Sequence, residues 1–279
     1  MAEPAQLPIA NVARLSVRLP LFLLFLLASV VTLLVLRAVD LFRRRPVDRA
    51  PVACLYLKVL CRLLGITLRQ HGVPISEAGL FVSNHVSWVD IVVLGACRPI
   101  LFLSKAEVAR WPVIGWIAKA IGTLFIERSA GRGNEVKTKI CASLRGGAQV
   151  LVFPEGTTTD GRTVLPFRRP LLGAAQDAGC PLQAISLCYL RDNEPDQIVP
   201  FVGNDSFQAH LVRLLSKPAV EVVVVFHEPV RRSELTGKRL ASHLEDQVAL
   251  GLRMIQTVSA GSSLAPGDPR HHLSDGRIR

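Results

Sequence analysis

The chain has 279 residues, of which 49% are hydrophobic, and a formal net charge of +11. This length is enough for one large core, or for a core with membrane segments, and the charge favours nucleic acid, anionic lipid or an acidic carrier protein as partners. Aromatic residues make up only 6% of the chain, and it contains no zinc-finger spacing, basic zipper or aromatic-interleaved RNA-binding motif, so nucleic acid is disfavoured. The six cysteines form no C-x-x-C pair, which indicates reduced residues rather than a disulfide framework or a metal site.

Two N-terminal segments predict membrane attachment. After a loose leader at 1–13, residues 19–36 form an apolar run that as a helix reaches about 27 Å, just enough to cross bilayer hydrocarbon. More arginines follow this run than precede it, so the positive-inside rule places its C-terminal side in the cytoplasm. Residues 52–66 predict a second helix, which lies in the membrane interface or pairs with the first as a hairpin. We therefore expect residues 1–66 to anchor the chain, and the alternative for 19–36 is a buried core helix.

Beyond these segments, short β-like runs alternate with helical stretches. The predicted strands span residues 67–71, 79–83, 100–103, 122–126, 149–153, 182–190 and 220–226, and the predicted helices span 90–96, 106–120, 134–145, 171–178 and 241–256. This alternation predicts an α/β domain over 67–258, in which helices flank a mixed, largely buried sheet. Residues 259–279 are rich in Gly, Ser, Pro and charge and have no periodicity, which predicts a disordered tail.

A short polar island between two apolar runs contains His85 and Asp90. A paired acid holds an imidazole in one tautomer and stabilises its protonated form, which makes a general base. In one continuous helix the two side chains would point about 140° apart, so they face each other only if a helix begins between them. Ser87, Asp90 and the following apolar run resemble a capping box, which predicts His85 on a loop, Ser87 near the N-cap and Asp90 in the first turn. These residues alone equally allow an aspartate that only caps the helix beside an ordinary loop histidine.

Two further segments offer polar groups where predicted strands end. Arg128 ends one strand and fits either a clamp for a phosphate or carboxylate, or a surface ion pair with Glu127. Pro154 and Gly156 force a turn directly after another strand, and this turn holds Glu155 at the edge where α/β proteins bind ligands. The sequence contains no Gly-rich nucleotide or phosphate loop and no nucleophile elbow.

Three short blocks occur in a fixed order along the chain. They are Asn84-His85-x-x-x-x-Asp90, Gly122-x-x-Phe125-Ile126-x-Arg128 and Phe153-Pro154-Glu155-Gly156-Thr157. Behind a membrane helix, this combination resembles the glycerolipid acyltransferases of the 1-acyl-glycerol-3-phosphate (lysophosphatidic acid) acyltransferase type, over roughly residues 50–230.

The resemblance implies roles for the block residues. His85 would take the proton from an acceptor hydroxyl while Asp90 orients it, and the hydroxyl would attack the acyl thioester of acyl-CoA or acyl-carrier protein, with no cofactor. The substrate-binding residues that it implies are Arg128 for the acceptor's phosphate, Glu155 and Gly156 for the shape of the acceptor pocket, and Asn84 and Thr157.

Two positions depart from the family pattern. Thr158 stands where the third block commonly continues with arginine, so a second phosphate contact is missing unless Arg162, Arg168 or Arg169 supplies it. Ala184 stands where a later block usually has proline. The segment around Thr158 looks more like the bacterial branch that includes lyso-ornithine lipid acyltransferases, which weakens the assignment of a phosphate acceptor.

We therefore expect a membrane-bound O-acyltransferase whose active site lies on the cytoplasmic side of a bacterial inner membrane. Its expected partners are an anionic lipid surface and an acyl donor, which is acyl-CoA or the acidic acyl-carrier protein. The expected acceptor is the lysolipid 1-acyl-sn-glycerol-3-phosphate, which would give phosphatidic acid. Lyso-ornithine lipid or another lysophospholipid is the nearest alternative acceptor. A thioesterase that uses water at the same base, and a non-enzymatic basic membrane-binding protein, are more distant alternatives.

Overall fold

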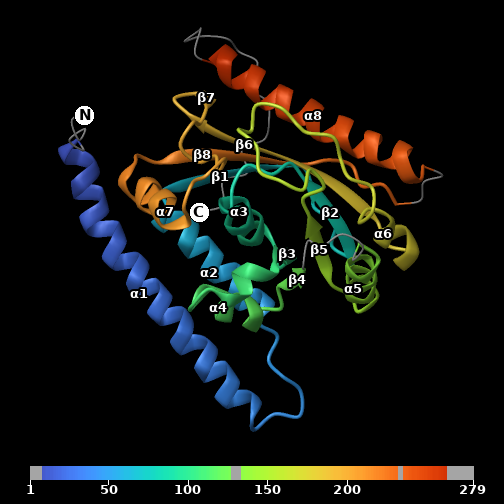
Figure 1. Ribbon diagram of the computed structural model, residues 1–279, viewed down its shortest axis with the longest axis horizontal. Coiled ribbons are helices and arrows are strands. Elements are labelled where there is room, and N and C mark those ends of the chain that lie inside the picture. The colour runs from blue at the N-terminus through green and yellow to red at the C-terminus, as the bar shows by residue number, and fades with distance from the viewer. Residues whose placement is uncertain (1–7, 127–132, 232–234, 263–279) are drawn as a thin grey trace.

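The computed structural model describes residues 8–126, 133–231 and 235–262, and its elements alternate between helices and strands (Figure 1). The helices are α1 (Ile9–Asp40), α2 (Ala50–Leu63), α3 (Val89–Cys97), the 3-10 helix η1 (Ala106–Arg110), α4 (Ile114–Ala120), α5 (Gly133–Arg145), α6 (Gly173–Ala178), α7 (Phe207–Ser216) and α8 (Gly237–Ser262). The strands are β1 (Ile66–His71), β2 (Gly79–Ser83), β3 (Leu101–Lys105), β4 (Leu124–Ile126), β5 (Gln149–Val152), β6 (Leu182–Arg191), β7 (Glu194–Pro195) and β8 (Val220–Phe226).

The strands form one mixed sheet in the order β1-β8-β6-β2-β5-β3-β4, with β7 paired to β6. The central strand β2 is parallel to both β5 and β6, whereas β8 is antiparallel to β6. Val82 of β2 pairs with Val152 of β5, so the carboxyl ends of these two strands meet at the same edge of the sheet. The segments that follow them therefore lie side by side.

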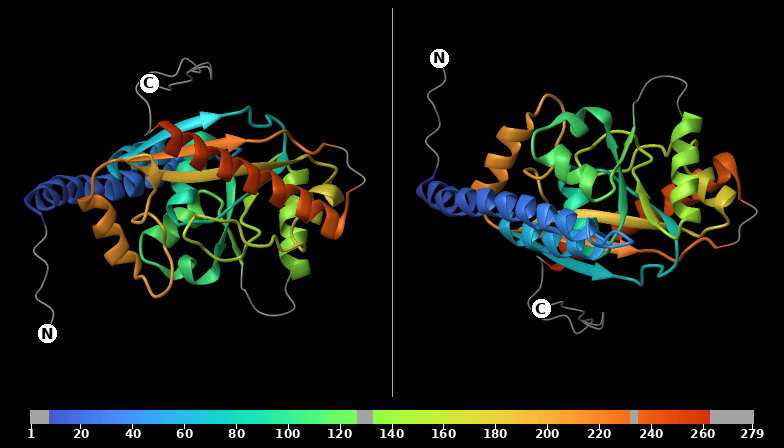
Figure 2. Two further views of the ribbon diagram at one scale, coloured as in Figure 1. Left: turned by 90° about the horizontal axis from the view of Figure 1, so that it is seen from above. Right: turned by 90° about the horizontal axis from the view of Figure 1, so that it is seen from below.

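Helices cover both faces of the sheet, as the two views of Figure 2 show, with α8 nearest the viewer in one and α1 in the other. Alternate side chains of β2 divide between the two faces. Phe81 packs in the cluster with α2, α3 and α7, while Leu80 and Val82 pack in the cluster with α5, α6 and α8. Every residue of β2 and of β5 is buried, as a sheet covered on both sides requires. The predicted α/β class with a mixed, buried sheet is confirmed.

The N-terminal helix α1 is longer than predicted. The apolar run 19–36 lies inside Ile9–Asp40, and the helix already begins within the predicted leader 1–13. Polar residues before position 19 hide this extension from a search for hydrophobic runs, but one of them has a partner in the fold. Arg18 donates to the carbonyl oxygen of Lys217 at 2.8 Å and so ties α1 to the C-terminal end of α7. The helix therefore lies along the flank of the molecule (Figure 1).

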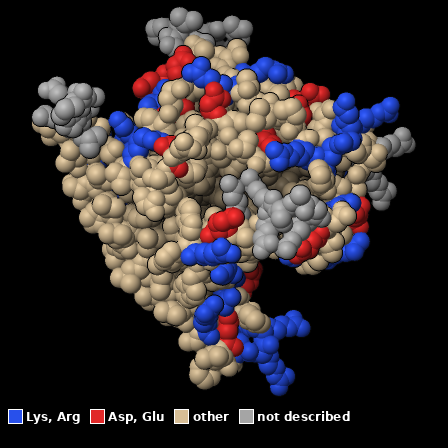
Figure 3. All heavy atoms as spheres, in the orientation of Figure 1, with Lys and Arg blue, Asp and Glu red and all other residues tan. Residues whose placement is uncertain are grey.

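The outward side of α1 is apolar. Its exposed large side chains are Ile9, Val12, Val17, Leu21, Leu23, Leu24, Leu27, Val31, Leu34, Val35 and Val39. Figure 3 shows this flank almost free of Lys, Arg, Asp and Glu. By length and composition α1 is able to cross a membrane, and its exposed apolar side suggests that the protein associates with one.

Three other segments differ from the sequence-based expectations. The helix predicted over 106–120 is broken into η1 and α4 at Val113, whose φ is 62°. Helix α7 was not predicted, although Ser206 caps it by accepting from the backbone N–H of Ala209. Helix α8 extends to Ser262, so the prediction of a disordered tail from residue 259 is wrong at its start, because the helix continues through small residues. The rest of that segment lies outside the described residues.

Candidate active site

The loop after β2 brings His85 and Asp90 together. His85 lies on this loop and Asp90 in the first turn of α3, as the spacing predicts. Nδ1 of His85 lies 2.7 Å from Oδ2 of Asp90, and the carboxylate is fully buried. Ser87 lies directly before the N-cap residue Trp88, near the N-cap as predicted, but its hydroxyl does not cap α3 and is buried without a partner among the described residues.

Asp90 is surrounded by hydrogen-bond donors. Its Oδ2 accepts from the backbone N–H groups of Val86 at 2.7 Å and Ser87 at 3.0 Å, in addition to His85. Its Oδ1 accepts from the hydroxyl of Tyr189 at 2.9 Å. A carboxylate is an acceptor at both oxygens, so this arrangement places a proton on Nδ1 of His85 and leaves Nε2 as an unprotonated base. Asp90 thus both closes the first turn of α3 and fixes the histidine tautomer.

The loop after β5 wraps around the histidine. The rings of His85 and Phe153 stack with centroids 3.9 Å apart and an interplanar angle of 10°. The backbone N–H of His85 donates to Oε1 of Glu155 at 2.7 Å, and its carbonyl accepts from the N–H of Thr159 at 2.9 Å. The ring is held by Phe153 and Asp90, and the His85 side chain still keeps 15% of its surface exposed to solvent.

Glu155 is 2% exposed, and both its oxygens are occupied by backbone donors. Oε1 accepts from His85, and Oε2 accepts from the N–H of Leu165 at 2.9 Å. Burial raises the pKa of Glu155 above its ordinary value, and the two N–H groups oppose that shift. Glu155 therefore joins the loop after β2 to the loop after β5, and the adjacent Gly156 completes the turn with a φ of +74° that favours glycine.

The remaining residues predicted to bind substrate differ in their exposure to solvent. Thr157 is exposed at the same turn. Asn84 is fully buried, and its amide exchanges two hydrogen bonds with the backbone of Leu187, at 2.8 and 2.9 Å, which fasten the end of β2 to β6. Substrate contact by Asn84 stays a prediction, and the role that the structure gives it is support of the histidine loop. Arg128 lies outside the described residues.

A cavity of about 500 Å³ opens at the opposite edge of the sheet, where β3 and β5 begin. Its lining includes Cys54, Leu57 and Phe102, with Arg98 donating to Gln149 at its polar side. His85 is not among its lining residues. The histidine follows the carboxyl end of β2, so this cavity is separate from the His85–Asp90 site.

Comparison with known proteins places the chain in a family. The sequence model described as "Acyltransferase" matches residues 66–188, the segment that contains His85, Asp90 and Glu155. The "Lyso-ornithine lipid O-acyltransferase" of Pseudomonas aeruginosa is 40% identical over 197 residues, which cover 71% of this chain and 76% of that protein. The chain belongs to the acyltransferase family.

Two further proteins resemble this acyltransferase at lower sequence identity. The "1-acyl-sn-glycerol-3-phosphate acyltransferase" of Neisseria gonorrhoeae is 34% identical over 148 residues, covering 53% of this chain and 58% of that protein. The crystal structure of the 1-acyl-sn-glycerophosphate acyltransferase from Thermotoga maritima superposes with a TM-score of 0.63 at 19% identity, covering 88% of this chain and 97% of that chain. At that identity the likeness concerns the fold, and it agrees with the predicted α/β class.

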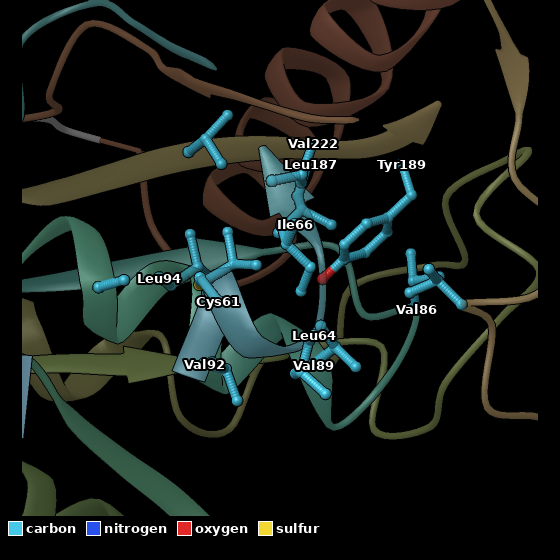
Figure 4. Packing of buried hydrophobic residues seen from close by; sticks show 14 of the residues in the cluster. Cys61, Leu64, Ile66, Val86, Val89, Val92, Leu94, Leu187, Tyr189 and Val222 are labelled. Atoms are coloured by element: carbon cyan, nitrogen blue, oxygen red, sulfur yellow. The ribbon is translucent and has the colours of Figure 1, made fainter. Parts of the chain in front are cut away.

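The sequence of this acyltransferase did not reveal two residues next to its site. Figure 4 shows the ring of Tyr189 reaching from β6 into the apolar cluster with its hydroxyl foremost. A tyrosine in an otherwise apolar strand was the available signal, because a buried hydroxyl needs a partner. His210 of α7 is also fully buried and accepts a hydrogen bond from Nε1 of Trp88, at 3.0 Å, in the histidine loop.

Proposed function

We propose that this acyltransferase moves a fatty acyl group from a thioester to the hydroxyl of lyso-ornithine lipid. The observation that carries the acceptor is the 40% identity, over 71% of this chain, with a relative named for that reaction. Thr158, which replaces the arginine common in the family, also fits an acceptor without a phosphate. The Neisseria relative is 34% identical over only 53% of the chain, so the phosphate acceptor expected from the sequence has weaker support than its alternative.

In the proposed reaction, Nε2 of His85 takes the proton of the acceptor hydroxyl as the hydroxyl oxygen attacks the thioester carbonyl. Collapse of the tetrahedral intermediate forms the ester and breaks the carbon–sulfur bond, and the departing thiolate takes the proton back from the imidazolium. Asp90 stabilises the imidazolium between these steps because its carboxylate lies 2.7 Å from Nδ1. The acyl donor is acyl-CoA or acyl-carrier protein, and no covalent acyl-enzyme is required.

We place this reaction at the cytoplasmic face of a bacterial inner membrane. The apolar side of α1 supplies a surface for the hydrocarbon, and Arg43, Arg44 and Arg45 follow it in sequence, where they suit anionic headgroups. In this arrangement residues 1–66 anchor the enzyme, and the residues from 67 to 258 carry the chemistry. The donor thioester arrives from the cytoplasm.

An acceptor panel tests the proposal. Purified enzyme in neutral detergent micelles would receive lyso-ornithine lipid, 1-acyl-sn-glycerol-3-phosphate or lysophosphatidylethanolamine, each with acyl-CoA and with acyl-carrier protein. We expect kcat/KM to be highest for lyso-ornithine lipid, and His85→Ala to lower it by about 10²–10⁴ with every acceptor. A higher kcat/KM for the glycerophosphate acceptor would reject lyso-ornithine lipid as the substrate.

Transfer to 1-acyl-sn-glycerol-3-phosphate is the second candidate, and the 34% identity with the Neisseria protein favours it. The role of Arg128 separates the two, because a residue that binds phosphate should matter more for that acceptor. Arg128→Ala should then raise KM for the phosphate acceptor more than for lyso-ornithine lipid. Free fatty acid as the main product in the presence of every lysolipid would instead indicate a thioesterase.

A further inference from the structure

The arginine that commonly follows the third block in the family is absent here, and no other cation takes its position. Thr158 stands there, and its hydroxyl donates to the carbonyl oxygen of Phe201 at 2.5 Å. This hydrogen bond fastens the turn after β5 to the loop before α7. Thr158 therefore acts within the protein, and a cation for the acceptor must come from another part of the chain.

The structure places the side chain of Arg168 against the turn that contains Gly156. A Cβ built on Gly156 would lie 2.8 Å from Cζ of Arg168, 2.9 Å from its Nη1 and 3.0 Å from its Nε, so the guanidinium covers the space left by the missing side chain. A guanidinium packs its weakly hydrated face on flat groups such as peptides and keeps its edge of N–H donors available. Gly156 thus provides the flat surface on which this cation rests.

The backbone that carries Arg168 is fixed at several points. The N–H of Arg168 donates to the carbonyl of Pro154 at 2.9 Å. In the same loop, the N–H of Leu165 donates to Glu155 and the N–H of Phe167 donates to Glu245, each at 2.9 Å. The Phe167 side chain is 6% exposed and packs in the core. The guanidinium is therefore held near Gly156 by a loop that is itself anchored.

This position is connected to the histidine loop, and the charge of Arg168 is available. Glu155, the residue before Gly156, binds the backbone N–H of His85 at 2.7 Å. Arg168 is exposed, and no carboxylate of the described residues forms an ion pair with it. We propose that Arg168 binds the anionic group of the acceptor headgroup, a carboxylate or a phosphate, and determines acceptor specificity in place of the missing motif arginine.

The inference rests on the proposed function and specifies one of its contacts. An ornithine headgroup offers a carboxylate, which matches the fork of a guanidinium as well as a phosphate does. Arg162 and Arg169 have the same charge in the same region, but the three atoms nearest to a Cβ on Gly156 all belong to Arg168. They serve as matched controls.

Steady-state kinetics of the full-length enzyme in neutral detergent micelles test the assignment. Arg168→Gln should raise KM for lyso-ornithine lipid about tenfold to a hundredfold, since a charge-assisted contact is lost, and should leave kcat and the donor KM nearly unchanged. Arg168→Lys should restore part of the loss, whereas Arg162→Gln and Arg169→Gln should change KM less than about twofold. Unchanged kcat and donor KM also show that the variant is folded.

An acceptor analogue sharpens the test. In this analogue of lyso-ornithine lipid, the headgroup carboxylate is converted to a carboxamide. The wild-type enzyme should have a higher KM for the analogue than for lyso-ornithine lipid, by the same factor by which Arg168→Gln raises the KM for lyso-ornithine lipid. The Arg168→Gln variant should have the same KM for both acceptors. If Arg168→Gln raised the donor KM more than the acceptor KM, Arg168 would bind the thioester substrate instead. If Arg169→Gln raised the acceptor KM as much as Arg168→Gln does, the effect would come from general surface charge. Either result overturns the inference. If the wild-type enzyme transferred acyl groups to no lysolipid, the proposed function would fail instead.

Discussion

Tyr189 and Asp90 are 99 residues apart in sequence, and the tyrosine hydroxyl donates to Oδ1 of the aspartate across 2.9 Å in full burial. Burial and the neighbouring Asp90 carboxylate raise the pKa of Tyr189 well above its usual value, so the hydroxyl keeps its proton and acts as a donor. Because Asp90 in turn holds His85, the three side chains form a line from β6 to the imidazole ring. Tyr189 is therefore a positioning residue for the proposed base.

Replacing Tyr189 by phenylalanine removes one donor without changing the ring. We expect kcat to fall about tenfold, because Asp90 loses the hydrogen bond from Tyr189 that helps to hold it, and through it His85, in place for proton transfer. Steady-state kinetics measure the effect, and both KM values should remain close to those of the wild type.

The chain offers a matched control for this substitution. Tyr56, the other tyrosine, forms a hydrogen bond of 2.5 Å with Thr32, which joins α2 to α1 and involves neither His85 nor Asp90. Tyr56→Phe should leave kcat unchanged. A kcat that falls equally in both variants, or in neither, would leave Tyr189 with only a packing role.

Asp90→Asn tests whether the carboxylate supplies charge or only closes the turn. Asparagine can place its oxygen where Oδ2 accepts from Val86 and Ser87, and can turn its amide to Tyr189, so α3 should still form. The imidazolium of His85 would lose its counter-charge. We expect kcat to fall about 10²-fold or more, with circular dichroism unchanged. Full activity in this variant would mean that Asp90 only caps the helix.

The local part of the site could be predicted from the sequence. The five-residue spacing of His85 and Asp90 fixes a loop followed by a helix start, and the strands before His85 and Glu155 are marked by apolar runs with clear ends. Parallel pairing of β2 with β5 then brings both loops to one edge. The helix start and the two strands depend on residues close in sequence, whereas the pairing of β2 with β5 does not.

The partners contributed by β6 could not be predicted. Tyr189 and Leu187 contact residues about a hundred positions earlier only because β6 lies next to β2, and alternating hydrophobicity does not give the strand order. For the same reason, the sequence could name Arg168 only as one of several arginines. Its contact with Gly156 depends on how the loop after β5 folds back on itself.

Glu155→Gln should damage the site through its backbone contacts. A glutamine has one acceptor oxygen for two buried N–H groups, those of His85 and Leu165, so one of them loses its partner. We expect a loss of about 1–3 kcal/mol in the free energy of unfolding and a lower kcat, because the histidine loop is displaced. Denaturant unfolding and acyl-transfer assays measure the two quantities.

Glu245→Gln is the control for that substitution. Glu245 accepts one hydrogen bond from the same loop, at Phe167, and a glutamine oxygen can keep it. This variant should retain its kcat and lose less stability than Glu155→Gln. Equal behaviour of the two variants would argue against a special connection between Glu155 and His85.

His210 makes the stability of the protein sensitive to acid. Its Nδ1 accepts from Trp88 and its Nε2–H donates to the carbonyl of Val199 at 3.1 Å, which requires a neutral ring. Burial, followed by the charge of Arg213, lowers the pKa of His210 below 6.5, although Asp205 opposes the shift. A lowered folded-state pKa gives stability that is fully present above about pH 6.5 and is lost as the pH falls, by at most about 1.4 kcal/mol per pH unit. The melting temperature in detergent between pH 8 and pH 5 should therefore fall more steeply for the wild type than for His210→Gln, and identical slopes would contradict this role.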